Sequence, residues 1–112
     1  MTAPPGATLR VALGQCSAAG PKPVNQDFHG AVVPAGAALA TKGIALALAD
    51  GIGSSECSQL ASAAAVRGFL DDYYASSEAW TVRRAACCVI GASNAWLHAQ
   101  TQRGAGRFDK ER

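Results

Sequence analysis

The chain has 112 residues, a net charge of +2 and four cysteines. This length suits one small domain or part of a larger one. Its 49% hydrophobic content includes only 6% aromatic residues, so we expect close packing of small side chains. The nearly balanced charge excludes the basic stripe that nucleic-acid binding needs, so no nucleic-acid partner is expected. The sequence has neither a signal-peptide pattern nor an apolar stretch of about 20 residues, and a cytoplasmic location is the default expectation.

The first half of the chain is predicted to supply three strands. Residues 1–8 are rich in Pro and Gly and should form a flexible N-terminal arm. Apolar and other residues alternate over 9–16, which predicts a first strand with one buried face. A loop with one glycine and two prolines follows, and a short strand is expected at 28–34. Residues 34–43 are interpreted as a small-residue, hairpin-like connection.

The chain is organised around residues 44–55, I-A-L-A-L-A-D-G-I-G-S-S. Leucine and isoleucine lie on one parity of this strand and alanine on the other, so we expect both of its faces to be buried. The strand ends at Asp50. A carboxylate at the tip of a buried strand is costly to leave unpaired, so it should meet a cation, N–H donors or water at the mouth of a cleft.

Two helices are expected after this strand. The first should begin at Ser54 or Ser55, with Ser54 as N-cap and Glu56 in the first turn. Its apolar face is expected to hold Cys57, Leu60, Ala61, Ala64, Ala65, Gly68 and Tyr73. The second should run over about 81–102, with a stripe of Val82, Ala85, Ala86, Val89, Ser93, Trp96 and Leu97. Strands followed by helices predict an α+β fold.

The four cysteines form no C-x-x-C pair. Two of them, Cys87 and Cys88, are adjacent in a helical stretch, where they cannot easily bridge to each other or set up a tetrahedral zinc site. We therefore expect Cys16, Cys57, Cys87 and Cys88 to be thiols in the core.

Two acidic residues stand out because each lies in a turn-like context beside a strand, Asp27 in N-Q-D-F and Asp50 in A-D-G-I-G. Hard ions such as Mg²⁺ and Mn²⁺ take oxygen ligands, so these two carboxylates and the carbonyl of Gly51 could hold one ion. A D-G pair more commonly marks a tight turn, with the aspartate capping the next helix, and this alternative stays open. Lys22 could hold a phosphate as a point charge or be simply solvated.

The segment G-P-K-P-V-N-Q-D-F-H-G and the later A-L-A-D-G-I-G-S-S resemble the opening half of the metal-dependent protein serine/threonine phosphatases of type 2C. That family usually shows R-x-x-N-E-D and then D-G-x-G-G. With F-L-D-D-Y-Y, S-E-A-W and A-W-L-H-A-Q-T-Q-R, the chain is most similar to the phosphatase portion of bacterial serine/threonine kinase/phosphatase proteins. The resemblance implies the N-terminal part of an α-β-β-α sandwich, with strands followed by two antiparallel helices.

The resemblance also implies roles for individual residues. Asp50 would bridge two Mn²⁺ or Mg²⁺ ions, Gly51 would offer its carbonyl to one, and Asp27 would hold metal-bound water. Lys22 falls where the family has a phosphate-binding arginine. The ions would activate a water that hydrolyses phosphoserine or phosphothreonine in a protein substrate. The chain departs from the family pattern at Gln26 for a glutamate, Ser54 for a glycine and Ile52 for a histidine that some members have.

The remaining metal aspartates of the family lie in downstream segments that this sequence lacks. Residues 9–112 are therefore expected to be the N-terminal portion of a phosphatase domain, apparently truncated and inactive alone, or a complete non-catalytic remnant. A kinase domain is possible in the same full-length chain, and unpaired strand edges should favour self-association of the fragment. The alternatives are a metal- or phosphate-binding regulatory module, with G-I-G-S-S at a helix N-terminus, and a structural piece that pairs with a missing half.

Overall fold

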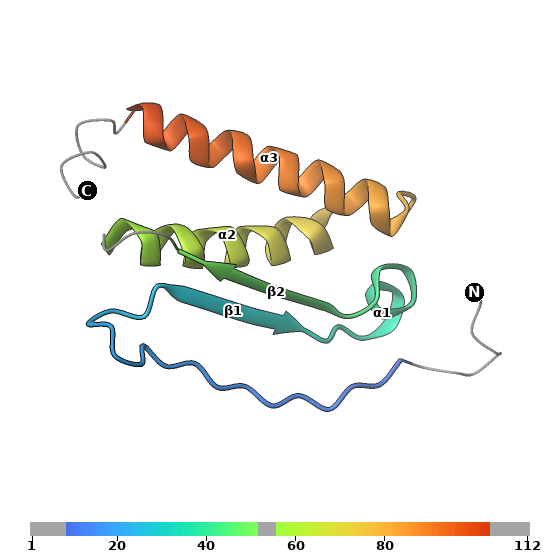
Figure 1. Cartoon of the computed structure of the whole chain (residues 1–112). Helices are drawn as coiled ribbons and strands as arrows, with labels where there is room; N and C mark the ends of the chain where they lie inside the picture. Colours follow the sequence, from blue (N-terminus) through green and yellow to red (C-terminus); the bar gives the residue numbers. More distant parts are fainter. Residues whose placement is uncertain (1–8, 52–55, 104–112) are drawn as a thin grey trace.

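The computed structural model describes residues 9–51 and 56–103. It contains an antiparallel sheet of two strands and three helices, which confirms the predicted α+β class. In chain order the elements are β1 (Asp27–Val32), α1 (Gly36–Lys42), β2 (Ala45–Asp50), α2 (Glu56–Ala75) and α3 (Val82–Arg103). Helix α2 lies against both strands and α3 lies against α2, so the layers run sheet, α2, α3 (Figure 1). Helices α2 and α3 run antiparallel.

Small residues let α2 lie close to the sheet. Phe28, Gly30 and Val32 of β1 alternate with outward-facing residues and pair with the three alanines of β2. A Cβ atom added to Gly30 would lie 3.0 Å from Leu70 Cδ1 and 3.2 Å from Val66 Cγ1. The buried apolar residues of the described part are Val66, Leu70 and Tyr73 of α2 and Ala85 and Val89 of α3.

The C-terminal end of α1 is fastened to the end of α2 by buried polar groups. Lys42 is only 6% exposed, and its Nζ donates to Ser76 Oγ at 2.7 Å and lies 5.3 Å from the centre of the Tyr73 ring. The Tyr73 hydroxyl donates to the Lys42 carbonyl at 2.6 Å, and the Tyr74 hydroxyl donates to the Gly43 carbonyl at 2.8 Å. Burial raises the pKa of both phenols. These bonds fix the point at which the chain turns back into β2.

The second long helix agrees closely with its prediction. Thr81 caps α3, because its Oγ1 accepts the Arg84 N–H at 3.1 Å and its carbonyl accepts the Ala85 N–H at 2.9 Å. Ala85 and Val89 of the predicted stripe are buried, whereas Val82 and Trp96 at its ends are exposed.

The strand predicted over residues 9–16 is absent. This segment is extended coil, and its three alternating apolar residues, Leu9, Val11 and Leu13, are all exposed. Alternation is a property of a strand's side chains, but a strand forms only when its backbone finds a ladder partner. The described strands pair with each other and not with this segment.

The connection at 34–43 holds a helix that the prediction missed. Helix α1 covers G-A-A-L-A-T-K, in which three of the seven residues are alanine, the residue with the highest helix propensity. The element order is therefore strand, helix, strand, helix, helix instead of three strands and two helices. The expected return to the central strand is correct, since β1 and β2 are antiparallel neighbours.

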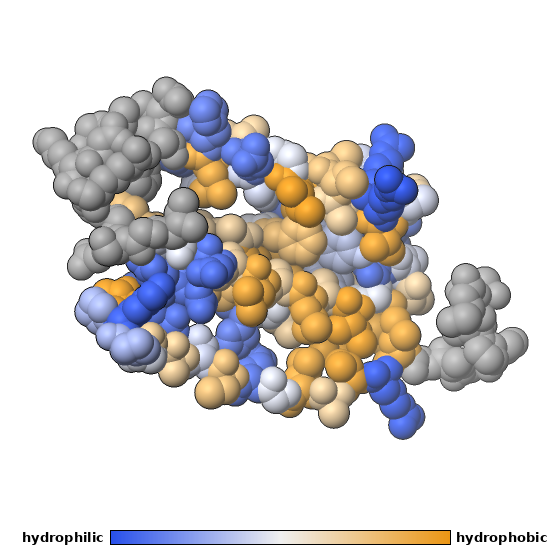
Figure 2. Space-filling model, in the orientation of Figure 1, coloured by the Kyte–Doolittle hydropathy of each residue, from blue (hydrophilic) through white to orange (hydrophobic). Residues whose placement is uncertain are grey.

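The central strand is buried on one face only. Its alanines face α2 and are half-buried, whereas Leu46 is 65% exposed and Leu48 is 75% exposed. The expectation of two buried faces is wrong because the described helices cover one side of the sheet. Figure 2 shows hydrophobic surface gathered over the sheet.

The predicted apolar face of α2 is correct at Tyr73 but misses the other buried residues of the helix, and the expected core position of the cysteines is wrong. Leu60 is 63% exposed, and the buried residues of α2 are Ser62, Val66, Leu70 and Tyr73. A helix this rich in alanine has apolar side chains on every side, so periodicity alone does not select a face. The cysteines form no disulfide, but Cys16, Cys87 and Cys88 are exposed and Cys57 is half-buried.

Some predictions fall outside the described residues: the arm at 1–8, the Ser54 cap, Ile52 and the tail at 104–112. Within the described part, no helix is long and apolar enough to cross a membrane.

Candidate functional site

The sheet register brings Asp27 and Asp50 directly opposite each other. Asp27 begins β1 and Asp50 ends β2, and they form the terminal pair of the antiparallel ladder. Opposite residues of such a pair project from the same face of a sheet. Asp50 shares the parity of Leu46 and Leu48, so the two carboxylates lie on the face away from α2, and both are exposed.

The neighbouring Asp50 raises the pKa of the Asp27 carboxyl group. A hydrogen bond with Asp50 is the main factor that raises the pKa of Asp27, and desolvation and the negative charge of Asp50 add to it. The positive charge of Lys22 lowers the pKa of Asp27 in partial compensation. Neighbouring carboxylates cannot both ionise without repulsion, so such a pair favours a shared proton or a cation.

Hydrogen bonds of neighbouring residues hold Asp27 and Asp50 in place at the end of the sheet. The Asp27 N–H donates to Asn25 Oδ1 at 3.0 Å, and Asn25 Nδ2 in turn donates to Ser17 Oγ at 2.8 Å. The Gly51 N–H donates to the Gln26 carbonyl at 3.1 Å, which extends the ladder one pair beyond the two aspartates. Asp27 and Asp50 are therefore held between bonded residues on both sides.

Gly51 is explained by close packing. A Cβ atom at this position would lie 2.8 Å from the Ser58 carbonyl oxygen and 2.9 Å from the Gln26 carbonyl oxygen. The described glycines with positive φ are Gly20, Gly36 and Gly43, so Gly51 does not adopt the left-handed conformation of a type I′ turn. Whether Asp50 caps α2 depends on residues 52–55, which lie outside the described part of the chain.

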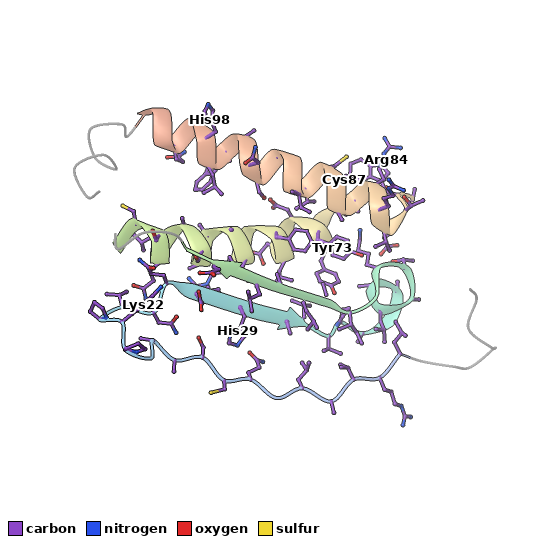
Figure 3. The ribbon with its side chains drawn as sticks, viewed as in Figure 1. Lys22, His29, Tyr73, Arg84, Cys87 and His98 are labelled. Atoms are coloured by element: carbon purple, nitrogen blue, oxygen red, sulfur yellow. The ribbon has the colours of Figure 1, made fainter. Side chains whose placement is uncertain are left out.

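Lys22 lies near the same end of the sheet. It is exposed, and its N–H donates to the Ala19 carbonyl at 3.3 Å within a turn. Figure 3 shows Lys22 in the loop beside the start of β1 and the end of β2. The positive charge of Lys22 lowers the pKa of Asp27. The structure therefore brings Lys22, Asp27 and Asp50 to the same end of the sheet.

The donor set suits a hard cation. Two adjacent carboxylates supply oxygen ligands and negative charge, and Mg²⁺ or Mn²⁺ can complete its octahedron with waters. Among residues 9–51 and 56–103, no group of three or more His, Cys, Asp or Glu side chains is placed to hold a metal ion. The pair therefore fits one hydrated ion, whereas the described residues bring no further carboxylate for a second.

Two features of the molecule had little signal in the sequence. The polar cluster at Lys42 was marked only by a lysine inside an apolar stretch. A groove of about 390 Å³ lies between α2 and α3, and it is lined by Ala64, Ala65, Gly68, Asp72, Ala92, Ser93, Trp96 and Leu97. Six of these residues, all except Asp72 and Ala92, belonged to the predicted apolar face of α2 or to the predicted stripe of α3.

Comparison of the chain with protein-family models, with curated proteins and with solved structures finds no match. The features of the chain that bear on its function are the motif residues and the geometry of the carboxylate pair.

Proposed function

We propose that this chain contributes to metal-dependent hydrolysis of phosphoserine and phosphothreonine in proteins, as in the type 2C phosphatases that its motifs resemble. The observation that supports the proposal is the register of the sheet, in which Asp27 and Asp50 face each other although they are far apart in the sequence. Both residues belong to the motifs that carry the resemblance. The raised pKa of Asp27 adds support, because its first cause is a hydrogen bond with Asp50, so the two carboxyl groups lie within reach of a single ion.

Four residues of the chain would have distinct roles in this hydrolysis. Asp27 and Asp50 would hold Mg²⁺ or Mn²⁺, and the chemistry that such an ion would supply is the activation of a water for hydrolysis of the phosphoester. Gly51 keeps the end of β2 against α2, so that Asp50 stays opposite Asp27. Lys22 attracts the substrate phosphate as a point charge, which is a looser contact than the bidentate grip of an arginine. A phosphorylated protein as substrate, a kinase domain in the same full-length chain and a cytoplasmic location remain predictions from the sequence.

The second candidate is a regulatory module that binds a metal ion or a phosphate and hydrolyses nothing. The favouring observation is that the described residues bring only two carboxylates together, enough to hold one ion but not two. Phosphate release from a phosphopeptide separates the two candidates, because both bind the ion and only the phosphatase turns substrate over.

Titration calorimetry with MnCl₂ tests the shared requirement. We expect Asp50→Asn and Asp27→Asn each to weaken Mn²⁺ binding at least about tenfold, or about 1.4 kcal/mol, since each removes half of the local negative charge. Asp71→Asn is the matched control, because Asp71 is an exposed aspartate on α2. Equal Mn²⁺ affinity in all four proteins would contradict the proposal.

A further inference from the structure

The backbone N–H and C=O groups of successive residues in β2 point alternately toward β1 and toward the opposite edge of the strand. The bond from the Gly51 N–H to the Gln26 carbonyl shows that the pair Gln26 and Gly51 is a hydrogen-bonded pair. Hydrogen-bonded pairs recur at every second residue of an antiparallel ladder, so the odd-numbered residues of β2, all alanines, bond to β1. The N–H and C=O groups of Leu46, Leu48 and Asp50 then point to the opposite edge. No described strand lies along that edge.

Within the described residues, strand β2 carries no lysine, proline or bulge that would hinder pairing at this edge. Natural edge strands carry lysine, proline, a bulge or an inward-pointing charge. Strand β2 reads A-L-A-L-A-D, with one charge at its last residue. Leu46 and Leu48 add exposed apolar surface beside the open backbone groups. A two-stranded sheet is also marginal by itself and is stabilised by further strands.

We propose that a second copy of this chain pairs with the open edge of β2. The two β2 strands run antiparallel about a two-fold axis at Ala47. The β1–β2 sheets of the two copies then form one sheet of four strands. In this register residue 44 of one copy pairs with residue 50 of the other, and the pairing extends over residues 44–50 of both copies. Leu46 of each chain then faces Leu48 of the second copy, and the backbone groups that point outward from one β2 bond to those of the other.

The charges and the side chains of β2 favour a copy of itself as the occupant. Asp50 of one chain faces Ile44 of the second copy, and the two Asp50 residues lie six residues apart along the paired strands, about 20 Å. This separation exceeds the Debye length of about 8 Å at physiological salt, so their repulsion is screened. Four leucines meet on the face away from α2, where each is now exposed to water. The contact is narrow, so we expect a weak, concentration-dependent dimer.

Sedimentation equilibrium of the 112-residue chain and two charge variants tests the pairing. We expect the unmodified chain to form dimers as its concentration approaches about 1 mM, the weak end of the affinity scale. Leu46→Glu and Leu48→Lys should each be monomeric, because each sets a charge against a leucine of the second copy. An equal mixture of the two variants should recover the dimer. One carboxylate then faces one ammonium, and the second facing pair remains Leu46 with Leu48.

Leu60→Glu is the matched control, since Leu60 is a comparably exposed leucine on α2, and it should dimerise like the unmodified chain. Circular dichroism checks that every variant keeps its helices. The proposal is overturned if the unmodified chain stays monomeric at about 1 mM. It is equally overturned if either β2 variant still dimerises, if the mixture stays monomeric, or if assemblies larger than dimers form.

Discussion

The carboxyl group of Asp27 has a raised pKa because of its surroundings. Its pKa lies above the ordinary value of 3.8, chiefly because of its hydrogen bond with Asp50. A folded chain that raises the pKa of an acid holds that proton more tightly than the unfolded chain does. The free energy of unfolding therefore falls as the pH rises from below 3.8 through the folded-state pKa, and it stays lowered at neutral pH.

Asp27→Asn should for this reason raise the melting temperature at pH 7. The gain should shrink as the pH falls through the folded-state pKa and vanish well below 3.8, where Asp27 is protonated in both states. Thermal unfolding of both proteins between about pH 3 and 7 measures the difference. Saturating Mn²⁺ should reverse its sign at pH 7, because the unmodified chain binds the ion more tightly and therefore gains more stability from it than the variant does. A variant that is less stable at pH 7 without metal would contradict this account.

Gly51 and Gly30 offer a comparison between two close approaches. A methyl group at Gly51 meets two backbone carbonyl oxygens, which cannot move without shifting β1 or α2. A methyl group at Gly30 meets the ends of two side chains, Val66 and Leu70, which can rotate. We expect Gly51→Ala to lower the free energy of unfolding by about 1–3 kcal/mol and Gly30→Ala by less. Urea unfolding followed by circular dichroism measures both, and the reverse order would be inconsistent with the packing described.

The pairing of Asp27 with Asp50 was foreseeable in part from the sequence. Both aspartates border apolar strands, which marked them among the eight acids of the chain, and the resemblance assigned them to one centre. Their register opposite each other depends on the turn through α1 between the strands, which no local pattern specifies. The metal-binding roles of Asp27, Asp50 and Gly51, and the phosphate role of Lys22, stay predictions.

The elements differ in how well their sequences specify them. Helix α3 was predicted within about one residue because Thr81 is a good cap and bulky apolar residues recur at helical spacing after it. Helix α1 was missed because seven residues between two strands read as a loop unless helix propensity is weighed. The face of α2 was misjudged because its alanines differ little in hydrophobicity from their neighbours. The exposed leucines of β2 show that apolar character at a position does not by itself create a partner to cover it.

The attachment of α2 to α1 can be tested through a single hydroxyl. The buried Tyr73 hydroxyl donates to the Lys42 carbonyl at 2.6 Å, so Tyr73→Phe leaves that carbonyl without this donor. We expect a loss of about 1–2 kcal/mol in the free energy of unfolding. Tyr74→Phe is the matched control, because its hydroxyl is only partly buried and water can replace it at the Gly43 carbonyl. Equal losses in urea unfolding would argue against a special role for the Tyr73 bond.

The whole molecule is thin for its length. Its extents are 56 × 31 × 19 Å, and its described apolar core comprises five residues. Apolar side chains are exposed on both outer layers, with Leu46 and Leu48 on the sheet and Val82, Ile90 and Trp96 on α3. A three-layer arrangement with both outer surfaces partly apolar gains modest stability from burial.

At this scale we expect the 112-residue chain alone to bind Mn²⁺ but to release no phosphate from a phosphoserine peptide. A dinuclear centre needs a bridging carboxylate and further acids, and the described residues bring together two carboxylates. A phosphate-release assay with Mn²⁺ measures turnover. Clear metal-dependent turnover that Asp50→Asn abolishes would mean that acids outside the Asp27–Asp50 pair enter the site.

The alternating backbone directions of β2 should be visible in deuterium exchange. In dilute solution the amide protons of Ala45, Ala47 and Ala49 are held in bonds to β1, whereas those of Leu46 and Leu48 face water. Exchange should therefore be slow at one residue and fast at the next, a sawtooth along a single strand. At high protein concentration the fast positions should slow down and the sawtooth should flatten. The alanine amides would thus report on the separation of β2 from β1, and the leucine amides would report on the association of two copies.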